Sequence, residues 1–236
     1  MKPIKFVKLI ILLISCHCFA QYAWTNRSLG TTNVIYSVTY GNGQYVAVGN
    51  GAILTSADGI IWTIRSSGTT ETFNSITYGN GQYVVVGSAG IILTSGDGIN
   101  WTSGTSGTTQ LLYSITYGNS QYVVVGSNGT ILTSVDGITW TSRSSGTTGW
   151  FKSITYDNNQ YIAVGGYNGI GPASIIFTSA DGITWTSRTS GTTQSLRSIT
   201  YGNNQYVVVG EGGTIITSID GITWTSRTSG TTFTLS

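Results

Sequence analysis

Side chains that could do acid–base or nucleophilic chemistry are scarce in most of this chain. Both cysteines and the single histidine lie within residues 16–18, so no imidazole base, thiolate or zinc ligand set follows them. Apart from five aspartates in a repeated motif, the acids are Glu71, Asp157 and Glu211. A glycosidase acting through Glu71 and Glu211 is a minor alternative. We expect no catalytic site, because this carboxylate pair lacks supporting groups. We also expect no bound metal and no cofactor.

The N-terminus has the layout of a secretory signal peptide. Three lysines within the first eight residues precede an apolar run over residues 9–14, and Ala20 ends a stretch suited to a signal peptidase. The run is too short to anchor the chain across a membrane. We therefore expect residues 1–20 to be a signal peptide, and the protein to be secreted or periplasmic without a transmembrane anchor. Lipidation at Cys16, as in a lipoprotein signal, is the alternative.

The rest of the chain carries little charge. Its formal net charge of +2 becomes −1 once the three N-terminal lysines are removed. Such a chain has no broad basic surface, so we expect no nucleic-acid partner. It also has no cysteine left for a disulfide, so packing and backbone hydrogen bonds must supply its stability.

An internal repeat accounts for residues 21–236. Its register is marked by five tryptophans at the end of each unit: Trp62, Trp101, Trp140, Trp185 and Trp224. They are spaced by 39, 39, 45 and 39 residues, so one unit has a six-residue insertion, within residues 167–174. A period near 40 is typical of the blades of a propeller.

One unit illustrates the expected strands, at residues 114–117, 121–125, 130–133 and 138–143. Each is rich in β-branched and aromatic residues, and Gly, Asn, Ser and Asp fill the turns. The sequence thus predicts an all-β fold, a β-propeller of five four-stranded antiparallel blades, over a β-sandwich or a solenoid. Residues 24–27 match an isolated fourth strand. They either pair at the seam of a five-bladed ring or complete a sixth blade, if further strands follow residue 236.

Each unit carries a Ser-x-Asp-Gly-x-x-Trp motif, with its aspartate at Asp58, Asp97, Asp136, Asp181 and Asp220. The motif resembles the Asp-box, or bacterial neuraminidase repeat, of sialidase-like propellers, with one residue fewer between Asp and Trp. The whole unit is similar to the repeats of photosystem II assembly-factor-like propellers. We expect the aspartates to shape their turns rather than bind metal, because each turn offers one carboxylate and every unit has the motif.

The resemblance to sialidases implies an arginine triad, a tyrosine–glutamate pair and an acidic residue. Five arginines of this chain instead follow a tryptophan by three residues, on the strand expected to be outermost: Arg27, Arg65, Arg143, Arg188 and Arg227. Arg197 is the exception. We therefore expect that sialidase activity is not carried over with the repeat.

Variation between the units is concentrated before the first strand and in the turn between the second and third strands. In an up-and-down blade these segments emerge at the same end, so their side chains should surround one mouth of the central channel. The candidate ligand-binding residues are Tyr36, Asn74, Tyr113, Trp150, Lys152, Tyr167, Arg197 and Glu211. Exposed loops also vary without function, but aromatic residues are costly to expose.

These observations favour a secreted, non-enzymatic recognition or scaffold module. It would bind a glycan or an extracellular protein through one face of the propeller. A sialidase-like glycoside hydrolase, or a degenerate relative of one, is one alternative. A chaperone-like role on an exported protein, implied by the resemblance to assembly factors, is the other.

Overall fold

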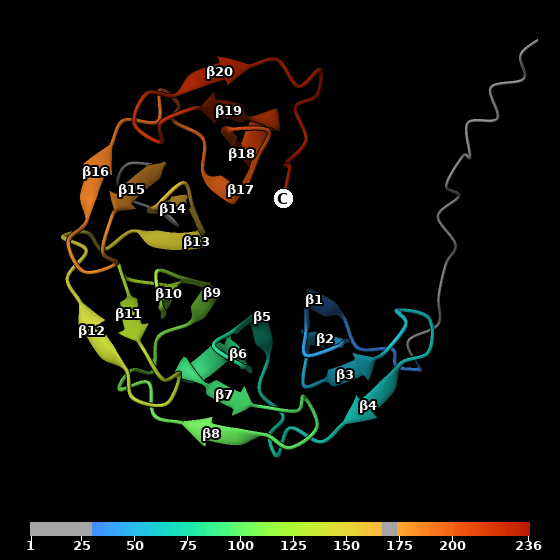
Figure 1. The fold of residues 1–236 in the computed structure, drawn as a ribbon. Helices are drawn as coiled ribbons and strands as arrows, with labels where there is room; N and C mark the ends of the chain where they lie inside the picture. The colour runs from blue at the N-terminus through green and yellow to red at the C-terminus, as the bar shows by residue number, and fades with distance from the viewer. Residues whose placement is uncertain (1–29, 167–173) are drawn as a thin grey trace, which may run out of the picture.

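The computed structural model describes residues 30–166 and 174–236, in which the chain forms twenty β-strands. They make five four-stranded antiparallel sheets, each with its strands side by side in chain order. Figure 1 shows the sheets set around a common centre, with the first strand of each sheet innermost and the fourth outermost. This is the architecture of a β-propeller, which confirms the predicted fold. We number its blades 1 to 5 along the chain.

The strand boundaries repeat from blade to blade. Blade 1 comprises β1 (Ile35–Gly41), β2 (Gln44–Gly49), β3 (Ile53–Ser56) and β4 (Thr63–Arg65). Blade 2 comprises β5 (Phe73–Gly79), β6 (Gln82–Gly87), β7 (Ile92–Ser95) and β8 (Thr102–Gly104). Blade 3 comprises β9 (Leu112–Gly118), β10 (Gln121–Gly126), β11 (Ile131–Ser134) and β12 (Thr141–Arg143).

The last two blades follow the same plan. Blade 4 comprises β13 (Trp150–Asp157), β14 (Gln160–Gly166), β15 (Ile175–Ser179) and β16 (Thr186–Arg188). Blade 5 comprises β17 (Leu196–Gly202), β18 (Gln205–Gly210), β19 (Ile215–Ser218) and β20 (Thr225–Arg227). Short 3-10 turns, η1 (Ser88–Gly90) and η2 (Glu211–Gly213), join the second and third strands of blades 2 and 5.

The second and third strands of the unit agree with the prediction to within one residue at each end, whereas the first and fourth differ more. The first strand of blade 3 begins at Leu112 rather than at residue 114, because Leu112 still pairs with Gly126 of the second strand. The fourth strand begins at Thr141 rather than at residue 138. Ile138 and Thr139, which precede it, belong to the aspartate turn, and their backbone N–H groups donate to the Asp136 carboxylate.

The hairpins between first and second strands are two-residue turns that require positive φ. In blade 1, Asn42 has a φ of 44° and Gly43 a φ of 77°, which suits the type I′ turn that matches strand twist. The turn pairs Gly41 with Gln44. It thereby sets the register of both strands.

The hydrophobic core lies between neighbouring blades. The second strand of each inner blade is buried on both faces: in blade 2, Val85 packs toward blade 1, while Val84 and Val86 pack toward blade 3. All three valines are 0% exposed. Such a strand needs a continuous run of β-branched residues rather than an alternating one.

Hydrogen bonds between side chain and backbone also join consecutive blades. Between blades 1 and 2, the Tyr83 hydroxyl donates to the Gly41 carbonyl. The Gln44 amide donates to the Asp97 carbonyl over 2.5 Å. Equivalent tyrosine and glutamine bonds recur at the next three interfaces. The invariant residues of the repeat therefore serve contact between blades.

The five blades form an open arc, with blades 1 and 5 at its two ends (Figure 1). Val38 of β1 is 58% exposed, while its four equivalents are 5–7% exposed: Ile76, Ile115, Ile154 and Ile199. The face of blade 1 that points away from blade 2 is therefore uncovered among the described residues.

Several predictions from the sequence concern residues outside the described part of the chain. They are the signal peptide at residues 1–20, the lipidation alternative at Cys16 and the fourth-strand match at residues 24–27. Within residues 30–166 and 174–236, no helix has the length and apolar character needed to cross a membrane.

Candidate functional site

The first strand of every blade contains a β-bulge at the same position. In blade 1, Ile35 pairs with Gly49 and Ser37 with Val48, so Tyr36 is left without a partner in the ladder. The equivalent bulged residues in the five blades are Tyr36, Asn74, Tyr113, Lys152 and Arg197. They are the variable residues that the sequence placed at one mouth of the channel. A bulge frees a residue from the ladder and re-aims its side chain.

A glycine at the end of the second strand makes room for each bulge. A Cβ on Gly87 would lie 2.0 Å from the Thr72 carbonyl oxygen, and one on Gly165 would lie 1.9 Å from the Trp150 carbonyl oxygen. No other residue fits so close to the backbone. The Val-Gly or Val-Gly-Gly ending of each second strand is thus the sequence signal for the bulge, which the sequence analysis did not use.

Lys152 lies between two aromatic rings at this mouth. Its ammonium group is 3.7 Å from the centre of the Tyr113 ring and 4.6 Å from that of Trp150. The two rings are 6.1 Å apart and inclined by 35°. This is a cation–π arrangement that joins blades 3 and 4.

The electrostatic surroundings of Lys152 disfavour its charge. Burial and, to a smaller extent, the nearby Arg197 guanidinium lower its pKa to about 8, and the Glu211 carboxylate opposes both effects. Burial also raises the pKa of the Tyr113 hydroxyl, which Arg197 partly offsets. The lysine therefore keeps most of its charge at neutral pH but is close to losing it.

Arg197 and Glu211 form an ion pair beside Lys152. The Nη2 of Arg197 donates to Oε1 of Glu211, and each side chain is 37% exposed. Glu211 is the first residue of η2, and its backbone N–H donates to the Ser195 carbonyl over 2.9 Å. The Nε of Arg197 is buried and makes no hydrogen bond with the residues that the structure describes.

The structure thus brings five of the eight candidate residues together, and we call this group the mouth cluster: Tyr113, Trp150, Lys152, Arg197 and Glu211. Asn74 instead donates to the Leu112 carbonyl over 2.8 Å, which links blade 2 to blade 3. Tyr36, in end blade 1, is 54% exposed. Tyr167 lies outside the described residues.

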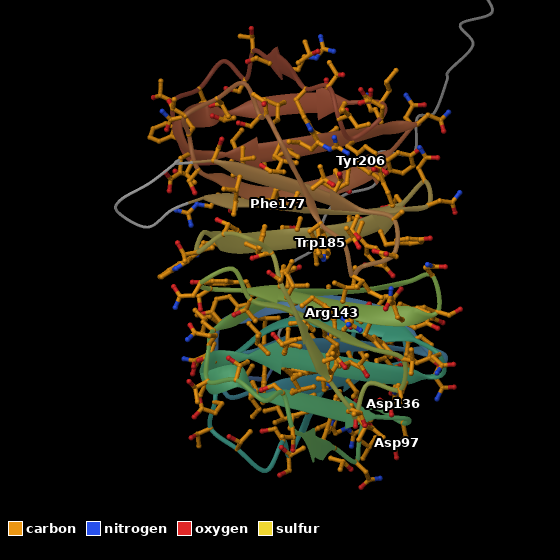
Figure 2. All side chains as sticks on the ribbon, turned by 90° about the vertical axis from the view of Figure 1, so that its left-hand side faces the viewer. Asp97, Asp136, Arg143, Phe177, Trp185 and Tyr206 are labelled. Carbon is orange, nitrogen blue, oxygen red and sulfur yellow. The ribbon has the colours of Figure 1, made fainter. Side chains whose placement is uncertain are left out.

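The two carboxylates considered for glycosidase chemistry are held by separate partners. The Ser88 hydroxyl donates to Glu71 over 2.6 Å in blade 2, while Glu211 pairs with Arg197 in blade 5. In blades 1, 3, 4 and 5 an arginine follows the repeated tryptophan and lies on the outer strand, whereas blade 2 has Gly104 at this position. On β12, Arg143 Nε donates to the Thr133 hydroxyl over 2.9 Å (Figure 2). The predicted outer position is confirmed for these four arginines, while Arg27 lies outside the described residues.

Figure 2 shows Asp97 and Asp136 near one end of the blades. Each repeated aspartate follows a third strand at the end where the first and second strands turn, since Ser134 pairs with Tyr122 and Tyr122 with Tyr117. The bulged residues of the mouth cluster lie near the start of the first strands, at the opposite end. Asp136 accepts bonds from the backbone N–H groups of Ile138 and Thr139, each over 2.8 Å, and from the Ser134 hydroxyl over 2.9 Å. The backbone bonds lower its pKa to about 2. Their stabilising effect is present above pH 3.8 and lost as the pH falls through about 2. These bonds account for the Ser and Asp of the motif.

The larger surface hollows are also repeated. One in blade 3 is lined by Thr108, Gly129, Ser145 and Thr147, and related hollows occur beside the corresponding segments of blades 2, 4 and 5. A hollow that recurs in several blades follows from the repeat. It distinguishes no blade as a binding site.

Comparison with known proteins identifies the fold through solved structures. No family model and no curated protein matches the chain. YCF48 from Cyanidioschyzon merolae superposes with a TM-score of 0.67 at 20% identity, over 89% of this chain and 77% of that one. YCF48 bound to D1 peptide gives 0.67 at 20% identity, over 85% and 68%. A nidogen/laminin complex gives 0.61 at 12% identity, over 78% and 75%. The chain is a β-propeller similar in fold to the photosystem II assembly factor YCF48.

Proposed function

We propose that this protein is a non-enzymatic recognition module that binds a polypeptide segment of a partner protein at the mouth cluster. The observation that carries the proposal is the pair of cations, Lys152 and Arg197, gathered with two aromatic rings at bulged positions. At most other positions the units share residues that form turns or contacts between blades. Only blades 3, 4 and 5 contribute residues to the mouth cluster.

The chemistry of the mouth cluster suits a peptide. Lys152 and Arg197 offer donors for backbone carbonyls or carboxylates, and the rings of Tyr113 and Trp150 offer apolar contact. The similar structures support this choice of ligand class, since one is YCF48 bound to D1 peptide and another is a nidogen/laminin complex. An assembly-factor-like role on an exported protein is the form of this function that we favour.

A glycan is the second candidate, because aromatic rings beside polar groups also bind sugars. A sugar ring stacks on an aromatic face. The Lys152 ammonium already lies over the Tyr113 and Trp150 rings. A glycan would have to displace this lysine, so we rank it second.

We propose that the protein acts after export, with residues 1–20 removed as a signal peptide. Intact mass of the protein recovered from the producing cells tests this directly. A chain that begins at Gln21 agrees with cleavage after Ala20. A lipid-modified Cys16 at the N-terminus would replace this proposal by the lipoprotein alternative.

The binding proposal is tested with a phage-displayed library of random linear peptides panned on the purified protein. Synthetic copies of enriched peptides are then titrated calorimetrically against wild type, Lys152→Ala and Arg197→Ala. We expect each variant to weaken binding at least about tenfold, because a hydrogen bond to a charged group is lost.

The matched control is Arg143→Ala, which removes a cation from the outer strand instead. It should leave the affinity unchanged. Failure of the folded protein to enrich any peptide, or equal loss in the control, contradicts the proposal. Binding to a glycan array that is abolished by Trp150→Ala would move the function to the second candidate.

A further inference from the structure

The isoleucine that follows the Asp-Gly pair of each motif is the same in all five units, yet it lies largely at the surface. The five side chains are 44–59% exposed: Ile60, Ile99, Ile138, Ile183 and Ile222. Each backbone N–H donates to the aspartate of its own turn, a bond that any residue except proline can make. The turn therefore needs a residue at this position but gives no reason for an aliphatic side chain.

The exposed positions on either side of this isoleucine vary between the units. The residue before the aspartate is valine in blade 3 and isoleucine in blade 5, where Val135 is 69% and Ile219 is 75% exposed, and it is alanine or glycine elsewhere. In blade 1, Ile61 is also 73% exposed. Single exposed aliphatic side chains are ordinary, but here one recurs in every blade and others gather beside it.

These side chains share one end of the molecule. We call it the aspartate end and define it by the five motif turns, at residues 56–62, 95–101, 134–140, 179–185 and 218–224. The blade before each turn holds it in place from blade 2 onward: Gln82 donates to the Asp136 carbonyl over 2.5 Å, and Gln121 to the Asp181 carbonyl over 2.6 Å. The isoleucines are thus presented on fixed backbone, which lowers the cost of ordering them on binding.

The aspartate end is negatively charged. Backbone N–H bonds lower the pKa of all five motif aspartates, so each carboxylate is ionised at neutral pH. In Asp58 and Asp220 these bonds all go to Oδ1, which leaves Oδ2 without a hydrogen bond from a described residue. Asp157 adds a sixth carboxylate in the hairpin between β13 and β14.

No cation offsets this charge within the turns. Neither the five motif turns nor the hairpins between first and second strands contain a lysine or an arginine. None of the six aspartates forms an ion pair with a residue that the structure describes. The end therefore combines exposed aliphatic groups with unpaired carboxylates.

We propose that the aspartate end is a docking surface for a basic partner protein. The partner's lysine or arginine side chains meet the carboxylates, and its aliphatic side chains pack on the isoleucines. Every turn supplies both groups two residues apart, as Asp136 and Ile138 do in blade 3, so the same pair is repeated around the end. Charge complementarity selects the sign of the partner, and the apolar contact supplies affinity. An acidic protein would be repelled.

Labelled amphipathic peptides of about 18 residues, or five helical turns, test this surface by fluorescence anisotropy. We expect a peptide of leucine and lysine to bind saturably and a peptide of leucine and glutamate not to bind. A serine–lysine peptide of the same charge should bind at least about tenfold more weakly, because it lacks apolar contact. Added salt should weaken the leucine–lysine complex, since exposed charges are screened.

Matched pairs of substitutions locate the site. Ile138→Ser with Ile183→Ser should weaken binding at least about tenfold. The control is Val34→Ser with Ile64→Ser, which removes side chains that are 56% and 54% exposed away from the aspartate end. It should bind like wild type. Ala180→Lys places a cation among the carboxylates and should also weaken binding. All four residues and Ala180 are exposed, so the variants should fold, which circular dichroism verifies.

Four outcomes would overturn the proposal: no binding of the leucine–lysine peptide, equal binding of the leucine–glutamate peptide, equal loss in the control pair, or loss in Lys152→Ala. Binding to phosphatidylcholine vesicles that requires Ile138 and Ile183 would replace the basic partner by a membrane. The mouth cluster lies at the opposite end of the blades, so its peptide binding is measured separately and does not depend on this result.

Discussion

Lys152 is the residue whose surroundings depart furthest from those of its counterparts. It is also the only lysine after Lys8. It lies between Tyr113 and Trp150 and next to the Arg197–Glu211 pair. The sequence predicted that these residues would share one mouth of the channel. It did not predict that the lysine would lie over both rings, because a side-chain contact across two blades depends on their packing.

Lys152 should titrate with a pKa of about 8, well below the ordinary 10.5. Between these values the unfolded chain binds more protons than the folded one, so this group makes the free energy of unfolding rise with pH. Arg197→Ala should move the pKa upward, because it removes a neighbouring cation and frees Glu211. The chemical shift of the lysine Cε in a pH titration of isotope-labelled protein measures both values. A wild-type pKa near 10.5 would contradict the burial described for this side chain.

At the scale of the elements, the repeated pattern was enough to predict four antiparallel strands and the turns between them. The β-bulge was not predicted, because hydrophobic alternation shows which residues face the core and not which residue leaves the ladder. Lys152 and Arg197 are bulged in the same way although their side chains differ from Tyr36 and Asn74. The backbone of the bulge is therefore set by the neighbouring glycine, independently of the side chain that it presents.

Gly87→Ala should destabilise the fold by about 1–3 kcal/mol, the usual cost of overpacking, because the new Cβ would lie 2.0 Å from the Thr72 carbonyl oxygen. Gly202→Ala is the matched control, since a Cβ there meets nothing within 4 Å. It should change stability by less than about 0.5 kcal/mol. Urea unfolding followed by tryptophan fluorescence compares the two midpoints. Equal midpoints would mean that the bulge relaxes to accept a side chain.

At the scale of the whole molecule, stability is distributed over the interfaces between blades. Among residues 30–166 and 174–236, blades 2, 3 and 4 have a neighbour on each face, whereas blades 1 and 5 have one. The number of blades was predicted from the spacing of the tryptophans. The way in which the ring closes was not predicted, because closure depends on which faces meet at the two ends of the arc.

Amide hydrogen exchange should reflect this distribution of contacts. In dilute protein, the amides of β10 and β14 should exchange most slowly, and those of β2 and β18 faster, because end blades open with the loss of a single interface. Mass spectrometry of peptic fragments resolves the blades. Uniform exchange across the five blades would show that the arc unfolds as one cooperative unit.

The separation between the glycine that shapes each bulge and the side chain that the bulge presents has a consequence for how such a chain diversifies. Contacts between blades use one set of residues in every unit, and the mouth uses another. A unit duplicated or exchanged by recombination between its near-identical neighbours therefore arrives with its joints intact. It changes only the side chains that it contributes to the mouth, such as Trp150 and Lys152 of blade 4, so one unit can replace another while the contacts between blades are kept.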